Sequence, residues 1–213
     1  MDFSTDCRAC PRLATFLEAG RLKYPGYYCK PVPAFGDLQL GDAPGLLIVG
    51  LAPGFHGANQ TGRPFTGDHA GILLYETLYA FGYASRPVSV AVDDGLQLAG
   101  CRITNAVKCV PPENKPETGE IKRCNEYLKQ ELAALPAGTA ILALGLIAHK
   151  AVLMALGLKA SGHVFAHAAS HALPGERRLY DSYHCSRYNT QTRRLTPEMF
   201  RAVFAQIASV QRS

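Results

Sequence analysis

The fold is decided by Gly45–Gly50 (G-L-L-I-V-G), which runs directly into Leu51–Gly54 (L-A-P-G). A short apolar run without alternating polar residues is typical of a strand that is buried on both faces. Arg102–Val107 and Thr139–Leu144 have the same character, and Leu179–Tyr183 is a shorter and more polar fourth candidate. The sequence therefore predicts four strands.

Helical patterns fill the gaps between these strands. Such alternation is typical of a parallel sheet that is covered by helices on both faces. We therefore predict an α/β fold, a three-layer α/β/α sandwich with a central, mostly parallel four-stranded sheet. Ligands of such folds bind beyond the carboxyl ends of the strands. The predicted helices are Pro11–Ala19, Gly71–Phe81, Glu120–Leu135, Leu146–Leu156 and a last helix that opens at Thr196-Pro197-Glu198.

Length and composition narrow the class of protein. The chain of 213 residues is long enough for one core, so we expect a single domain over residues 1–213. Hydrophobic residues make up 47% and charged residues 18%, which excludes long disorder. No apolar run is long enough to span a membrane, and Asp2 and Asp6 argue against a signal peptide. We expect a cytoplasmic protein.

Four cysteines suggest a metal site. Cys7 and Cys10 form a C-x2-C pair, and Cys109 and Cys124 follow about a hundred residues later. Four thiolates around one point suit an iron–sulfur cluster or a tetrahedral zinc ion. Disulfides or buried free thiols are the alternatives, and disulfides are rare inside cells. Of the three other cysteines, Cys101 is expected in the core or at a strand edge.

The loop after the first strand reads G-L-A-P-G-F-H-G-A-N and lacks a phosphate-binding motif of the Walker or dinucleotide type. The next loop, Thr61–Asp68, carries Phe65 between turn-forming residues. This is an unusual place for an aromatic ring that only fills a core, and we interpret Phe65 as a ring that stacks on a flat ligand. Asp68 stands before a predicted helix and is either a helix cap or a carboxylate of the site, and the two roles are compatible.

Polar side chains also follow the second and fourth strands. Asn105 lies in an apolar strand, where a buried amide needs hydrogen-bond partners and can read the edge of a base. His184 ends the fourth strand and precedes Ser186–Arg194 (S-R-Y-N-T-Q-T-R-R), which has three arginines and no acid. This segment is either a solvated loop or a phosphate-contacting loop. The net charge of +5 is compatible with an anionic partner.

These motifs occur in a familiar order. The pattern G-L-A-P-G…H-G-A-N-x-T-G-R-P-F-T-G-D, then T-N-A-V-K-C-x-P-P, then S-Y-H-C-S-x-x-N-T-Q-T-x-R-L-T resembles the uracil-DNA glycosylase superfamily. It is most similar to the family 5 branch, whose members carry a four-iron, four-sulfur cluster. The resemblance extends from Cys7 to the last helix. It implies a repair enzyme that extrudes uracil from DNA and hydrolyses its N-glycosidic bond.

The resemblance also implies roles for individual residues. The catalytic candidates are Asp68, Asn105 and His184. The substrate-binding candidates are Gly50, Ala52, Gly54, Phe55, Phe65, Asn105 and His184. The DNA-binding candidates are Asn59, Arg63, Ser186, Arg187, Asn189, Thr190, Gln191 and Arg193. The ligands of a [4Fe-4S] cluster would be Cys7, Cys10, Cys109 and Cys124.

The chain departs from the family pattern at two places. Leu51, Ala52 and Gly54 offer no polar side chain in the first motif, which leaves Asp68 as the main acid and suggests looser base selection, extending to hypoxanthine and xanthine. Cys185 replaces the usual proline after the motif histidine. The apolar first motif keeps open a non-catalytic nucleic-acid-binding protein that is stabilised by a cluster or by zinc. An electron-transfer protein is disfavoured, because no flavin or nicotinamide motif is present.

His163, His167 and His171 recur every four residues. A helix would place them on one face and could bind zinc, but Gly162 and the Pro174-Gly175 turn bracket them, and no acid of the H-E-x-x-H kind intervenes. We expect loop histidines near DNA instead. The expected partner is double-stranded DNA, with single-stranded DNA as an open alternative, and the protein is expected to be a monomer that does not bind membranes.

Overall fold

The computed structural model describes residues 3–38 and 45–211. Its centre is a six-stranded sheet with the order β1-β3-β2-β4-β6-β5. The four middle strands run parallel, and the two edge strands pair antiparallel to their neighbours. The strands are β1 (Phe35–Asp37), β2 (Leu46–Gly50), β3 (Cys101–Asn105), β4 (Ala140–Leu144), β5 (Ser170–Ala172) and β6 (Arg178–Ser182).

The sequence predicted four strands, but the sheet has six. The four predicted strands are the middle ones, and the two missed strands are the edges β1 and β5. Each edge strand has only three residues, with the sequences F-G-D and S-H-A. So short a segment shows no apolar periodicity, and an edge strand need not be buried on both faces. The sheet is therefore mostly parallel, as predicted, but wider.

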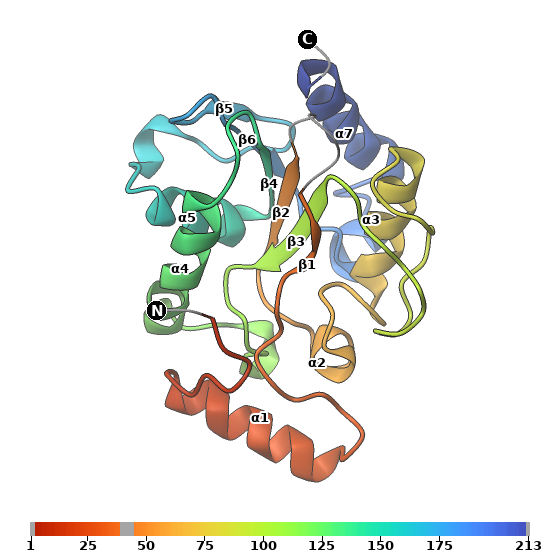
Figure 1. Cartoon of the computed structure of the whole chain (residues 1–213), viewed down its shortest axis with the longest axis vertical. Helices are drawn as coiled ribbons and strands as arrows, with labels where there is room; N and C mark the ends of the chain where they lie inside the picture. Colours follow the sequence, from red (N-terminus) through yellow and green to blue (C-terminus); the bar gives the residue numbers. More distant parts are fainter. Residues whose placement is uncertain (1–2, 39–44, 212–213) are drawn as a thin grey trace.

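Helices cover both faces of the sheet, which confirms the three layers. In Figure 1, α3 and α7 lie on one side of the strands, and α4 and α5 lie on the other. Along β2, Leu46 and Ile48 pack with α3 and α7, whereas Leu47 and Val49 pack with α4 and α5. The helices are α1 (Pro11–Lys23), α2 (Ala58–Thr61), α3 (His69–Ala80), α4 (Thr118–Ala133), α5 (Leu146–Ala155), α6 (Arg187–Gln191) and α7 (Pro197–Gln211), with 3-10 turns at Pro112–Asn114 and Ala160–Gly162.

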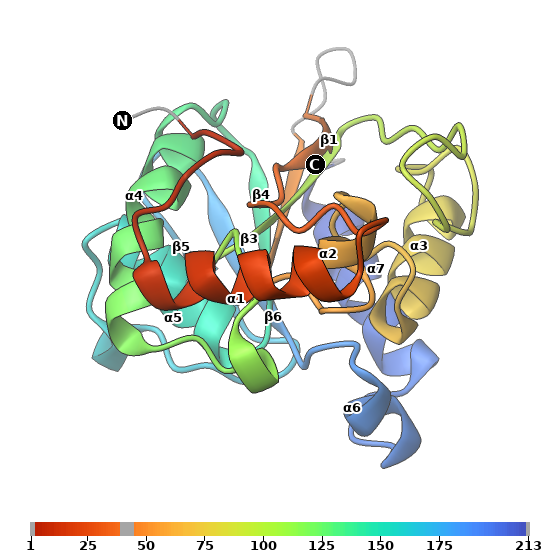
Figure 2. The ribbon, with the colours of Figure 1, turned by 90° about the horizontal axis from the view of Figure 1, so that it is seen from below.

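The carboxyl ends of the middle strands share one edge of the sheet, because these strands are parallel. Figure 2 shows α1 crossing this side of the molecule, with its end next to α2, and α6 projecting at the edge of the view. Loops that follow β2, β3 and β6 therefore meet here. No helix among the described residues is both long and apolar enough to cross a membrane.

Candidate active site and cysteine quartet

A cavity of about 340 Å³ opens at this edge of the sheet. The four side chains on which the sequence prediction centred, Phe65, Asp68, Asn105 and His184, all line it. They come from the ends of β3 and β6 and from the loop before α3. The structure thus brings them together as expected, while their chemical roles stay predictions. The full lining is Leu51, Ala52, Gly54, Ala58, Phe65, Asp68, Ala70, Asn105, Asn114, His184 and Ser186.

Gly50, at the end of β2, allows this close approach. A Cβ atom at this position would lie 2.3 Å from Asn105 Oδ1 and 2.7 Å from the Phe65 ring. Both distances are far below a van der Waals contact, so any side chain at position 50 would displace the amide or the ring. Gly50, the last residue of β2, therefore contributes by having no side chain, which leaves room for Asn105 and Phe65.

Phe65 has a strained backbone, with φ at +53°, in the left-handed region that bulky residues rarely adopt. Helix α3 holds it there. Tyr75 donates a hydrogen bond to Pro64 O at 2.8 Å, and a Cβ on Gly71 would lie 1.9 Å from Phe65 O. The Phe65 ring lies 5.8 Å from the His184 ring, between centroids, with 29° between their planes.

His184 is held in a neutral state. Burial lowers the pKa of its imidazole from the ordinary value to about 4. Its Nδ1 and the Oδ1 of Asn105 are both buried, and neither has a hydrogen-bond partner among the described residues. Buried polar atoms are rarely left without partners. Both atoms belong to residues that line the cavity, which suits a site where a polar ligand completes the hydrogen bonds.

Asp68 combines the two roles that the sequence left open. Its Oδ1 accepts a hydrogen bond from Gly71 N at 3.0 Å, which caps α3. It also lines the cavity, and a Cβ on Gly57 would lie 2.5 Å from its Oδ2. Burial raises the pKa of this carboxyl, and the backbone hydrogen bond from Gly71 opposes the rise. The cap therefore fixes the carboxylate through Oδ1.

The predicted loop Ser186–Arg194 contains a short helix, α6, that is attached to His184. Asn189 Nδ2 donates to His184 O at 2.8 Å, and Thr190 Oγ1 lies 3.0 Å from His69 Nε2 of α3. Ser186 caps α6 and lines the cavity. The exposed side chains of this segment are Arg187, Tyr188, Gln191, Thr192, Arg193 and Arg194.

Three residues that the sequence analysis predicted to bind substrate or DNA do not line the cavity, namely Phe55, Asn59 and Arg63. Phe55 packs against Phe16 and Tyr24, with ring centroids 5.6 Å away in each case, and does not line the cavity. Asn59 is fully buried, and its amide nitrogen bonds to Phe55 O at 3.3 Å. Arg63 is 2% exposed and forms an ion pair with Asp94 at 2.6 Å. These side chains support the loops from inside, and we assign them no contact with substrate or DNA.

The sequence analysis missed two residues of this region. Asn114 lines the mouth of the cavity from a loop after β3, with φ at +57°. Its only sequence signal is an asparagine in a proline-rich turn, and asparagine tolerates the left-handed region. Tyr188 is 69% exposed on α6. A large aromatic side chain within a basic tract was its available signal.

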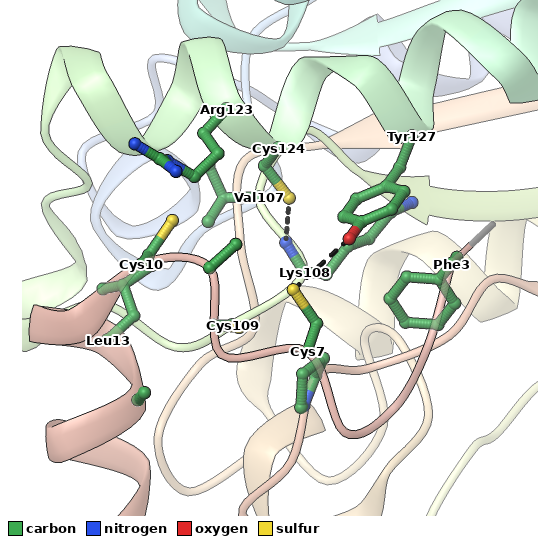
Figure 3. Close-up of a pocket in the computed structure, with 13 residues that line it drawn as sticks. Phe3, Cys7, Cys10, Leu13, Val107, Lys108, Cys109, Arg123, Cys124 and Tyr127 are labelled. Carbon is green, nitrogen blue, oxygen red and sulfur yellow. Dashed lines mark hydrogen bonds between the residues drawn. The ribbon is translucent and has the colours of Figure 1, made fainter. Parts of the chain in front are cut away.

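The four predicted cysteine ligands line one small cavity between α1, the end of β3 and α4. Figure 3 shows Cys7, Cys10 and Cys124 turned toward a common space, with Cys109 beside them. Lys108 N donates to Cys124 Sγ at 3.3 Å, and the Tyr127 hydroxyl donates to Cys7 Sγ at 3.3 Å (Figure 3). Such bonds stabilise thiolate ligands from outside the ligand shell.

The pKa values and the spacing of the four cysteines indicate which kind of metal group this cysteine quartet fits. Burial, followed by the nearby thiols, raises the pKa of Cys109 to about 12, so a bound cation is needed to displace the protons. Two sulfurs on one zinc ion lie about 3.8 Å apart, because each Zn–S bond is about 2.3 Å. Among the described residues, the quartet does not form a group of three or more donor atoms within 4.8 Å of one another. This wider spacing fits a multi-iron cluster better than a single zinc ion.

His149, His171 and Asp181 do form such a compact group. His149 Nδ1 lies 2.7 Å from Asp181 Oδ1, and His149 Nε2 lies 2.9 Å from His163 O. Both partners are acceptors, so both ring nitrogens carry protons. Burial works to lower the pKa of His149, but the hydrogen bond to Asp181, the charge of Asp181 and the bond to His163 O together outweigh it, and the pKa is raised. We interpret the group as a buried ion pair beneath β6.

The cavity and its surroundings define a class of protein, namely α/β proteins that bind a flat polar ring at the carboxyl edge of a parallel sheet. The family model described as "Uracil DNA glycosylase superfamily" matches residues 38–208. The chain belongs to this superfamily.

Relatives with curated names refine the family. The type-5 uracil-DNA glycosylase of Thermus thermophilus is 48% identical over 201 residues, which cover 92% of this chain and 90% of that protein. The type-5 enzyme of Pyrobaculum aerophilum is 39% identical and covers 96% of this chain and 88% of that protein. The type-4 enzyme of the same organism is 38% identical, but the match covers 63% of this chain and 59% of that protein. The near-complete matches confirm the resemblance to the family 5 branch.

Proposed function

We propose that this chain is a DNA-repair glycosylase that extrudes uracil from DNA and hydrolyses its N-glycosidic bond, leaving an abasic site. One observation carries the proposal. Phe65, Asp68, Asn105 and His184 line one cavity, and two of them hold buried polar atoms that lack partners among the described residues. Those atoms suit the polar edge of a pyrimidine.

The reaction breaks the bond between C1′ of the sugar and N1 of uracil. The bonding electrons leave with the base, water adds to C1′, and a proton is released. Negative charge therefore develops on a uracil carbonyl oxygen, and a preorganised N–H donor lowers the barrier. His184 supplies this donor from a neutral imidazole, because its pKa is about 4. It stabilises the leaving base without transferring a proton to it.

Phe65 and Asn105 recognise the base. The Phe65 ring offers a face for stacking, and its strained backbone keeps that face at the cavity wall. The Asn105 amide can both donate and accept hydrogen bonds, so it can match the adjacent carbonyl and N–H of uracil. Gly50 keeps both side chains within reach of one ring.

Asp68 acts on the sugar side of the reaction. The sugar becomes positively charged as the base leaves, and a fixed carboxylate stabilises that charge and orients the attacking water. The cap on α3 holds the carboxylate for this task. Asn114 stands exposed at the cavity mouth, where its amide can contact the same water or the sugar.

The cysteine quartet holds a [4Fe-4S] cluster in this proposal, with Cys7, Cys10, Cys109 and Cys124 as ligands. The cluster would supply a structural link, since glycosidic hydrolysis moves no electrons. The quartet joins α1, the end of β3 and α4, and the loop between Cys109 and Cys124 carries Asn114 to the cavity. The cysteines thus position one wall of the site.

DNA binds along the side that carries the cavity and α6. Arg187, Gln191 and Arg193 are exposed there and suit phosphate contacts, and Tyr188 projects between them. We propose double-stranded DNA as the main substrate and a monomeric, single-domain protein over residues 1–213 that acts in the cytoplasm. The side chains of Leu51, Ala52 and Ala58, which line the cavity, carry no polar group that would reject hypoxanthine or xanthine.

The test is a uracil-containing duplex that is treated with the protein and then with alkali. We expect strand breaks with the wild type. His184→Ala should lower kcat by about 10²–10³-fold, with nearly unchanged affinity for a duplex that carries an uncleavable analogue. His163→Ala is the control, because His163 does not line the cavity. If the wild type cleaves neither uracil nor hypoxanthine nor xanthine substrates, the chain is a binding protein instead.

A further inference from the structure

A cluster of aromatic side chains lies beside the cavity and takes no part in the reaction described above. Tyr24 and Tyr27 stack with ring centroids 4.7 Å apart and 21° between their planes. Tyr24 also meets the edge of Phe55 at 5.6 Å and the His56 ring at 5.7 Å. The two tyrosines are half-buried and His56 is exposed, so part of this surface is open to solvent.

Hydrogen bonds attach this cluster to the loop and helix that follow β2, whose residues Gly54 and Ala58 line the cavity. Tyr28 N and Cys29 N donate to Gln60 O and Asn59 O, each at 3.0 Å, which fastens the segment after α1 to α2. The Tyr27 hydroxyl bonds to His56 Nδ1 at 2.8 Å. His56 stands in the loop whose Gly54 lines the cavity. Figure 2 shows the end of α1 beside α2, with α6 projecting at the edge of the same view.

The charge of this segment suits a polyanion. Residues 19–30 (A-G-R-L-K-Y-P-G-Y-Y-C-K) contain three basic residues and no acidic residue. Lys30 forms an ion pair with Asp6 at 3.1 Å, and Arg21 donates a hydrogen bond to Cys29 O at 3.0 Å, which leaves Lys23 as the cation for a partner. Lys23 is exposed, and its Nζ lies 5.4 Å from the centre of the Tyr24 ring. Aromatic rings interleaved with cationic side chains are typical of surfaces that bind single-stranded nucleic acid, because bases stack on the rings and phosphates meet the cations.

We propose that Tyr24, Tyr27 and His56 form a stacking surface for unpaired bases of a DNA strand that adjoins the extruded nucleotide. This rests on the proposed function only in taking DNA as the substrate. The strand must be unpaired here, because the faces of paired bases are covered by their neighbours in the duplex. Gly54 lines the cavity from the loop that carries His56, and Ser186 lines it at the start of α6. The stacking surface and α6, the two proposed DNA contacts, therefore adjoin the cavity through different loops.

The test compares two probes that carry the same uncleavable abasic-site analogue, a single-stranded oligonucleotide and a blunt duplex. In Tyr24→Leu/Tyr27→Leu, leucine keeps apolar bulk and removes the flat ring. We expect about tenfold weaker binding of the single strand, with unchanged binding of the duplex. The salt dependence of binding should stay the same, because stacking releases no counterions. Tyr79→Leu is the matched control, since Tyr79 is 51% exposed on α3 and outside this surface.

A second measurement needs no variant. Shortening the single-stranded oligonucleotide on either side of its abasic-site analogue should weaken its binding to the wild type step by step. The stacking proposal is overturned if the double variant binds both probes like the wild type, or if both weaken equally with a shallower salt dependence, which would indicate phosphate contacts. Uracil excision by the wild type is measured on the same preparation. Its absence would reject the proposed function, whereas normal excision with unaltered single-strand binding would reject only this surface.

Discussion

Asp68 has to be tested in a way that separates its charge from its cap. Asparagine caps helices as well as aspartate does, but it lacks the negative charge. We predict that Asp68→Asn lowers kcat for uracil excision by about 10²-fold and leaves the free energy of unfolding nearly unchanged. Single-turnover excision and urea unfolding of the same variant give the two numbers.

Asp68→Ala is the matched variant for the cap. It should lose both the charge and about 1 kcal/mol of stability. If Asp68→Asn retains full activity, the carboxylate serves the helix alone and takes no part in catalysis.

His184 should also affect stability in acid. Its pKa is about 4 in the folded protein, whereas an unfolded histidine titrates near 6.5. Between these values the unfolded chain binds more protons, so stability falls as the pH falls from about 6.5 toward 4. We predict that the urea midpoint of the wild type drops more between pH 7 and pH 5 than that of His184→Gln. Equal drops would mean that His184 is not held neutral by burial.

Individual residues of the site could be predicted where a polar residue stands at or just after the end of an apolar strand. Asn105 and His184 follow apolar strands, and parallel strands bring their ends together. Phe55 and Asn114 show where this reasoning stops. Phe55 is near the right place in sequence, but its loop turns the ring toward α1. Asn114 reaches the cavity through a left-handed turn, which no periodic pattern signals.

At the level of elements, α6 shows why a polar tract was read as a loop. The helix has five residues, and its stability comes from contacts with other elements, such as the bond from Asn189 to His184 O. Short isolated helices are marginal in water, so their sequences need little helical signal. The long helices and the middle strands were predictable because burial dictates their apolar patterns over many residues.

Tyr188 is exposed on α6, on the side where we propose that DNA binds, and an aromatic ring there can fill the space that an extruded nucleotide leaves. We predict that Tyr188→Ala weakens binding of uracil-containing duplex by about tenfold and reduces extrusion. A fluorescent base analogue placed opposite the lesion reports the extrusion. Tyr79→Ala serves as the control for loss of an exposed tyrosine. If Tyr188→Ala changes neither signal, α6 contacts the phosphates alone.

At the scale of the whole molecule, the cysteine quartet ties the N-terminal segment to the middle of the chain. Losing a metal site belongs to the substitutions that cost more than about 4 kcal/mol, and each kcal/mol shifts Tm by about 2–4 °C in a chain of this size. We predict that Cys7→Ser lowers Tm by roughly 10 °C and removes bound iron and visible absorption.

Cys101→Ala is the control for this prediction, because Cys101 is buried in β3 and does not line the quartet cavity. It should keep its iron. A colourless wild type that contains zinc instead of iron would contradict the cluster assignment. Loss of the cluster should leave the six-stranded sheet folded, because the hydrophobic clusters on its two faces contain none of the four cysteines.

The separation of the quartet along the chain also sets the order in which the protein can be made. Cys124 follows Cys7 by 117 residues, so at roughly 5–20 residues per second it is synthesised roughly 6–23 s later. Until then the nascent polypeptide on the ribosome holds at most three of the four thiols. Delivery of iron to the cluster that we propose would therefore be a late event in the biogenesis of this protein, after the first half of the sheet has been translated.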